Sequence, residues 1–121
     1  MQETQPIRIK SMAPEIIREP ISKEKFQEHL ATLGDMVKVV VDIVRKIMTM
    51  GGELHADGEQ LLLADGSRQE NLWGANVYSD GTNAPRLEYT SLINIRPRQG
   101  NRSQEIQSQE IQNEVRKVIE K

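Results

Sequence analysis

The stretch MVKVVVDIVRKIMTM, residues 36–50, constrains the fold more than any other part of the chain. Apolar side chains recur in it every three or four residues, as at Met36, Val40 and Ile43, and a second apolar stripe runs beside the first. This spacing is typical of an amphipathic helix with a wide apolar face. We therefore predict one long buried helix over residues 36–50, ended by the two glycines that follow it.

The composition indicates one small domain with an aliphatic core. Of the 121 residues, 36% are hydrophobic and 3% aromatic, and there is no cysteine, which excludes disulfides and thiolate metal sites. The formal net charge of −2 gives no reason to expect nucleic acid or a membrane as a partner. Residues 1–13 lack the apolar core of a signal peptide, and no apolar run reaches the ~20 residues of a membrane span. We predict a cytoplasmic protein with a flexible tail at 1–13 and a single domain at 14–121.

The N-terminal part of the domain predicts a strand followed by a helix. Residues 15–21 form a short apolar segment in which Pro20 cannot donate to a sheet ladder, so we place this strand at a sheet edge. Residues 22–33 carry apolar side chains at helical spacing, with Ser22 as the N-cap. The imidazole of His29 lies on the polar side of this predicted helix.

Beyond the predicted long helix, apolar and polar residues alternate, which predicts strands. The pairs Asp57-Gly58 and Asp65-Gly66 are typical of two-residue turns, so we predict hairpins at both. Further strands are expected at 71–78 and 86–95, and a last helix begins at Ser108. The predicted fold class is α+β, a mainly antiparallel sheet of about four to five strands packed by the long helix, in the order β-α-α-β-β-β-β-α.

The segment GGELHADGEQ presents His55, Asp57 and Glu59 at intervals of two residues. Imidazole and carboxylates are ligands for zinc, manganese or iron. However, Gly58 interrupts the strand on which these side chains would share one side. We therefore predict no metal and no cofactor. The alternative hypothesis is a metal- or histidine-dependent enzyme in which His55 acts with Asp57 or Glu59.

The segment NIRPRQGNRS, residues 94–103, has a composition that favours anion binding. The guanidinium groups of Arg96 and Arg102 can bind carboxylates or phosphates through paired hydrogen bonds. Gly100 allows the main chain to come close to a ligand. The alternative is a basic surface loop whose arginines pair with acidic side chains. The predicted ligand-binding residues are Arg96, Arg102, Asn94, Gln99, Asn101, His55, Glu53 and Asn76.

Trp73 is the one tryptophan of the chain and lies on a predicted strand. Such a residue in a small domain is more often part of a core or a dimer interface than a stacking platform for a ligand. Gly74 and Asn76 face the other side of the same strand. Because buried amides need hydrogen-bond partners, we expect Asn76 and Asn94 to brace the arginine-bearing segment 94–103, which we call the arginine loop.

The motifs GGELHAD, LWGANVY and INIRPRQGNRS together resemble an uncharacterised family of small bacterial proteins, a domain of unknown function. The resemblance covers about residues 15 to 121 and implies that the polar residues of these motifs belong to the family pattern. It implies no activity. The chain departs from that pattern at Ser79 and Gln109, where proline is usual, and in its extra residues 1–13.

These observations lead to three functional hypotheses of different classes. We favour a small binding module with a polar, arginine-lined site for an anionic ligand. The second hypothesis is the enzyme centred on His55. The third is a homodimeric interaction protein without a ligand, in which an apolar face or edge of the sheet pairs two copies.

Overall fold

The computed structural model describes residues 13–19, 24, 26, 36–78 and 86–120. Within these residues it confirms an α+β fold on an antiparallel sheet of five strands. Residues 1–12 of the tail predicted at 1–13, most of the predicted helix at 22–33 and the loop at 79–85 lie outside the described residues.

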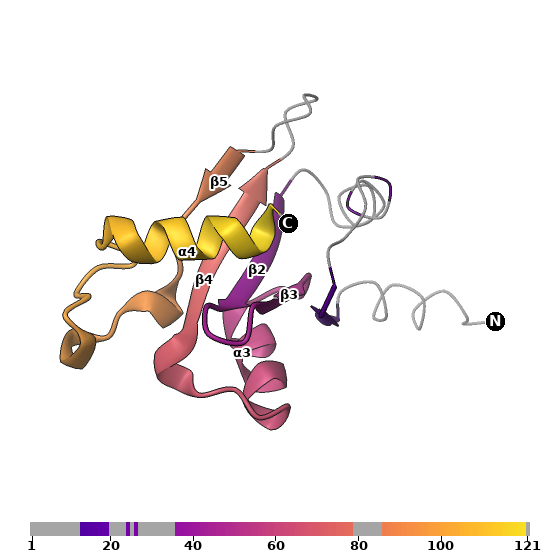
Figure 1. The fold of residues 1–121 in the computed structure, drawn as a ribbon, viewed down its shortest axis with the longest axis horizontal. Coiled ribbons are helices and arrows are strands. Elements are labelled where there is room, and N and C mark those ends of the chain that lie inside the picture. Colours follow the sequence, from indigo (N-terminus) through magenta and orange to yellow (C-terminus); the bar gives the residue numbers. More distant parts are fainter. Residues whose placement is uncertain (1–12, 20–23, 25, 27–35, 79–85, 121) are drawn as a thin grey trace.

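The strands are β1 (Glu15–Ile17), β2 (Met36–Asp42), β3 (Ile47–Met50), β4 (Leu72–Tyr78) and β5 (Arg86–Glu88). Their order in the sheet is β1-β3-β2-β4-β5 (Figure 1). The helices are α3 (His55–Ala64) and α4 (Gln109–Ile119), and the 3₁₀ segments are η1 (Gln69–Asn71), η2 (Leu92–Asn94) and η3 (Pro97–Gln99). Along the described residues, the order is therefore β-β-β-α-β-β-α, which differs from the predicted one.

The long helix predicted over residues 36–50 is wrong, because these residues form the hairpin of β2 and β3. Asp42 holds the turn: its buried carboxylate accepts from the main-chain N–H groups of Val44 and Arg45, each at 2.9 Å. A strand with both faces buried is apolar along its whole length, and periodicity alone does not separate such a strand from a buried helix. The four valines of β2 are β-branched and favour the strand.

The hairpin predicted at Asp57-Gly58 is also wrong, because residues 55–64 form α3. The predicted hairpin at the second Asp-Gly pair is the end of this helix instead. Gly66 has a left-handed φ of 106°, and the Ser67 N–H donates to the Leu62 carbonyl at 2.9 Å. A glycine in this conformation commonly follows a helix C-cap. The pair therefore ends a helix instead of reversing a strand.

Several other predictions are confirmed. β1 lies at a sheet edge, and β4 covers most of the strand predicted at 71–78. α4 follows Ser108, whose hydroxyl accepts from the Ile111 N–H at 3.2 Å.

The strand predicted at 86–95 is shorter than expected, since β5 ends at Glu88. None of the helices in the described part of the chain is long and apolar enough to cross a membrane.

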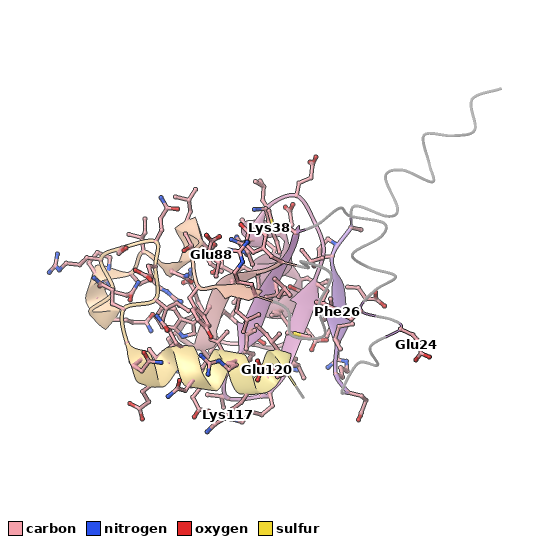
Figure 2. The ribbon with its side chains drawn as sticks, turned by 90° about the horizontal axis from the view of Figure 1, so that it is seen from above. Glu24, Phe26, Lys38, Glu88, Lys117 and Glu120 are labelled. Carbon is pink, nitrogen blue, oxygen red and sulfur yellow. The ribbon has the colours of Figure 1, made fainter. Side chains whose placement is uncertain are left out.

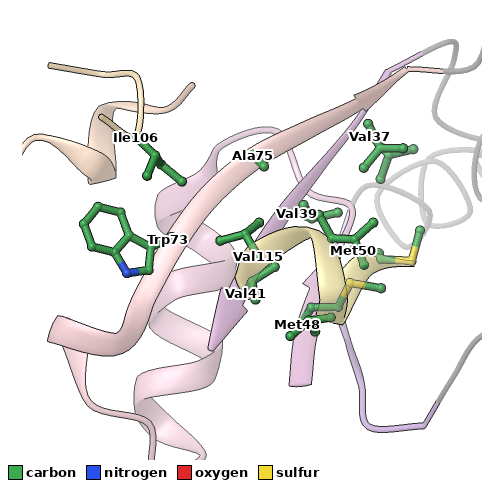
Figure 3. Packing of buried hydrophobic residues seen from close by; sticks show 12 residues of the cluster. Val37, Val39, Val41, Met48, Met50, Trp73, Ala75, Ile106 and Val115 are labelled. Atoms are coloured by element: carbon green, nitrogen blue, oxygen red, sulfur yellow. The ribbon is translucent and has the colours of Figure 1, made fainter. Parts of the chain in front are cut away.

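Helices cover both faces of the sheet. On one face, α4 crosses β2 and β4 (Figure 1), and its Val115 packs in a cluster with Val39 and Trp73 (Figure 3). On the other face, Leu62 of α3 packs against Val40. Burial on both faces explains why β2 is apolar at nearly every position.

Helix α3 comes close to the sheet at Gly58. A Cβ at this position would overlap Thr49 Oγ1 and would lie 3.0 Å from Val40 Cγ2. A glycine inside a helix is less favourable than alanine by about 1 kcal/mol, and here the close packing requires it. The approach also brings His55, the first residue of α3, onto β4.

Candidate functional site

A row of polar side chains crosses the sheet on the face that α3 partly covers. The antiparallel register places Lys38 of β2 opposite Asn76 of β4, and Asn76 opposite Glu88 of β5. Directly opposite residues project from the same face, and this is the face of Val40, which packs against α3. Figure 2 shows Lys38 and Glu88 on the side of the sheet away from α4. We call Lys38, Asn76 and Glu88 the polar row.

Asn76 is the buried centre of the polar row, with 7% of its surface exposed. Its Nδ2 donates to Glu88 Oε1 at 2.9 Å and to the Thr90 carbonyl at 3.3 Å. Because both partners are acceptors, the amide nitrogen must face them, and Oδ1 points elsewhere. Asn76 Oδ1 is buried and has no hydrogen-bond partner.

Glu88 and Lys38 form the charged ends of the polar row. Glu88 Oε1 also accepts from the Tyr78 hydroxyl at 3.0 Å. The Asn76 and Tyr78 hydrogen bonds hold the pKa of Glu88 below its ordinary value, and the charges of Arg86 and Lys38 contribute. Lys38 is half-buried as a residue, and its ammonium makes no hydrogen bond or ion pair with another described residue.

His55 lies beside the polar row at the start of α3 and is 8% exposed. Its Nε2–H donates to the Ala75 carbonyl at 2.8 Å, so in the neutral ring the lone pair is on Nδ1. Burial lowers the pKa of His55, and the nearby Lys38 charge adds to this, whereas the Ala75 carbonyl and Asn76 oppose it. His55 is therefore neutral at pH 7.

These groups offer an unpaired donor beside an unpaired acceptor. The Lys38 ammonium can donate, while Asn76 Oδ1 can accept. The arrangement therefore suits a compact molecule that carries both hydrogen-bond acceptors and donors.

The predicted anion-binding residues are engaged with the main chain. The Arg96 guanidinium donates to the carbonyls of Gln69 and Leu72 and lies 4.0 Å from the centre of the Trp73 ring. Gln99 Nε2 donates to the Glu70 carbonyl at 3.1 Å. Arg96 therefore fastens the start of β4, and its fork is already occupied by acceptors.

Two buried asparagines fix the segment after η2 to the sheet. Asn94 accepts from the Gly74 N–H at 2.8 Å and donates to the Gly74 and Gln104 carbonyls. Asn101 donates to the Asn94 carbonyl at 2.8 Å and accepts from the Gln107 N–H. Asn94 thus braces the arginine loop as predicted, whereas Asn76 braces β5. Arg102 and Glu53 are both exposed, and within the described residues no hydrogen bond links either of them to these asparagines.

The three residues of the metal hypothesis lie on α3 but do not act together. His55 turns to the sheet, Asp57 is exposed, and Glu59 is buried and accepts from Gln69 Nε2 at 3.4 Å. The charge of Glu59 also acts on Arg96. In the described part of the chain, no three histidine, cysteine, aspartate or glutamate side chains are grouped to hold a metal ion.

Sequence reasoning missed Lys38 and Glu88. A helix over residues 36–50 places Lys38 on its polar side, away from Asn76. In a strand over residues 36–42, Lys38 falls on the face opposite to its neighbours Val37 and Val39, and this phase was the available signal.

Comparison with known proteins identifies one family. A family model described as "Protein of unknown function (DUF5674)" matches residues 15–121. No significant match was found among curated proteins or solved structures.

Proposed function

The chain belongs to this family of unknown function, and from its own residues we propose that it binds a small polar molecule at Lys38, His55 and Asn76. One observation carries the proposal. Asn76 Oδ1 is a buried acceptor without a partner, and the facing residue Lys38 carries a donor without a partner. A molecule between them would satisfy both.

The energetics support this interpretation. Nearly all buried polar groups in proteins are hydrogen-bonded, and an unpaired one costs about 1–3 kcal/mol. An apolar residue in place of Asn76 would avoid that cost. The amide is also held by two hydrogen bonds of its own, to Glu88 and Thr90. A group fixed in advance loses little conformational freedom when a ligand arrives.

The site at Arg96 and Arg102 for an anionic ligand stays a prediction, and so do the homodimer and the cytoplasmic location. The occupied fork of Arg96 supports the anion site less than the unpaired groups support the polar row. Light scattering of the purified protein tests the homodimer.

The proposal is tested by nuclear magnetic resonance with a library of small polar fragments. We expect fragments to move the amide signals of Lys38, His55 and Asn76 in a saturable way. Replacing Lys38 by Met should weaken such binding about tenfold or more, as expected for loss of a hydrogen bond to a charged group.

The matched control is Lys117→Met, which removes an exposed lysine from α4 on the opposite face. Lys117→Met should leave every affinity unchanged. If no fragment moves the signals of the polar row, or if both lysine variants bind alike, the proposed function is wrong.

A further inference from the structure

The charges around the polar row balance one another. Lys38 supplies one positive charge, and Glu88 supplies one negative charge because its hydrogen bonds favour the ionised form. His55, the first residue of α3, contacts the Ala75 carbonyl of β4 and adds no charge because burial lowers its pKa. A simple anion drawn to Lys38 would be repelled by Glu88, and a simple cation drawn to Glu88 would be repelled by Lys38.

The unpaired groups also have a fixed order across the strands. The Lys38 ammonium can only donate, and Asn76 Oδ1 can only accept. They project from directly opposite positions on β2 and β4, where Cβ atoms are about 5 Å apart. The site thus presents one donor next to one acceptor.

We infer that the ligand is uncharged and presents a carbonyl oxygen beside N–H groups, as carboxamides, ureas and lactams do. This inference rests on the proposed function and adds the class of ligand to it. The carbonyl oxygen accepts from Lys38, and the neighbouring N–H group donates to Asn76 Oδ1.

Matched pairs of an amide and its acid test the inference, because the members of each pair have nearly the same shape. The probes are nicotinamide with nicotinate, and benzamide with benzoate, titrated at pH 7 while the amide signals of Lys38 and Asn76 are followed. We expect each amide to bind at least about tenfold more tightly than its acid, since the acid lacks the N–H donors and meets Glu88.

Glu88→Gln provides the sharper variant, since glutamine can still accept from Asn76 and Tyr78 through its carbonyl. It removes the negative charge, so the acids should gain affinity and the preference for amides should narrow. Lys38→Met should weaken the amides and leave the acids no better. If Glu88→Gln does not fold, the wild-type preference and Lys38→Met still decide.

The outcomes separate this inference from the proposed function. Tighter binding of the acids, or equal binding of both members of each pair, overturns the inference while leaving a polar binding site. Binding of other fragments at the polar row with no response to any amide also overturns it. If nothing moves these signals, the proposed function fails together with the inference.

Discussion

Replacing Gly74 by Ala tests whether the loop before η2 is packed against β4 as tightly as its geometry indicates. A Cβ on Gly74 would lie 2.6 Å from Ser91 Cβ, 2.7 Å from Ser91 Oγ and 3.1 Å from His55 Cδ2. Non-bonded carbon atoms rest about 3.5–4.0 Å apart, so Ser91 would have to move by about 1 Å.

Ser91 cannot move freely, because its main chain and side chain are both bonded. Its N–H donates to the Gln104 carbonyl at 3.0 Å, and its Oγ accepts from the Ile93 N–H at 3.2 Å. Asn94 ties the same loop to both main-chain groups of Gly74. Overpacking of this kind costs about 1–3 kcal/mol, and alanine returns about 0.5–1 kcal/mol relative to glycine in a strand. We expect Gly74→Ala to lower the free energy of unfolding by about 1 kcal/mol, the difference between this cost and this return.

Urea denaturation of four proteins measures the effect: wild type, Gly74→Ala, Ser91→Gly and the double variant. Ser91→Gly removes both of the closest atoms, so it should relieve the clash and give a coupling free energy of about 1 kcal/mol or more. The reasoning is refuted if Gly74→Ala is as stable as wild type. It is equally refuted if Gly74→Ala costs as much in the Ser91→Gly background as alone.

Three further predictions concern single positions. Burial lowers the pKa of His55 from its ordinary value of 6.5, so His55 binds a proton more readily in the unfolded protein than in the folded one. The contribution of the neutral, buried His55 to the free energy of unfolding is therefore complete above about pH 6.5 and declines as the pH falls below it. His55→Gln should remove that decline, and denaturation at several pH values measures it; a difference between the two proteins that is independent of pH contradicts the prediction. Gly58→Ala should lower the free energy of unfolding by about 1 kcal/mol, because the overlap with Thr49 outweighs the preference of helices for alanine. A variant that is more stable than wild type in urea denaturation would show that α3 can move outward. Arg96→Lys should lower the free energy of unfolding by about 1–2 kcal/mol, because lysine cannot donate to the Gln69 and Leu72 carbonyls at the same time, as the guanidinium does. Arg98 is exposed, so Arg98→Lys should change the free energy of unfolding by less than about 0.5 kcal/mol. Equal stability of the two variants in urea denaturation contradicts this prediction.

The sequence predicts the edge strand β1 and the last helix α4 better than the central hairpin of β2 and β3. Ser108 marks the start of α4 because a hydroxyl at an N-cap is a local signal that needs no knowledge of distant residues. The hairpin at 36–50 carries no such signal. Its residues are apolar at helical intervals because both faces of β2 are covered, and which elements cover them depends on the whole fold. Periodicity therefore gave the right burial with the wrong element.

The candidate site divides in the same way. Asn76 was predicted because an amide in an apolar strand needs a hydrogen-bond partner, whereas His55 was predicted from its spacing with Asp57 and Glu59. Arg96 was predicted as a ligand for an anion, and its guanidinium donates to two main-chain carbonyls, because composition does not reveal whether a guanidinium faces solvent or the main chain. Lys38 depended on the strand phase of residues 36–42, which the helix prediction concealed.

The polar row and the close contacts around it depend on the same geometry. Gly58 lets α3 lie against the sheet, and Gly74 lets His55 and the Ser91 loop lie against β4. A side chain at Gly74 would press on His55 Cδ2, and one at Gly58 would push α3, which carries His55, away from Thr49 and Val40. Variants at these glycines should therefore weaken ligand binding as well as stability, although neither glycine belongs to the polar row. Lys38 is half-exposed and is not among the close neighbours of either glycine. Lys38→Met should therefore weaken binding with little loss of stability. This difference separates residues that bind from residues that shape the site.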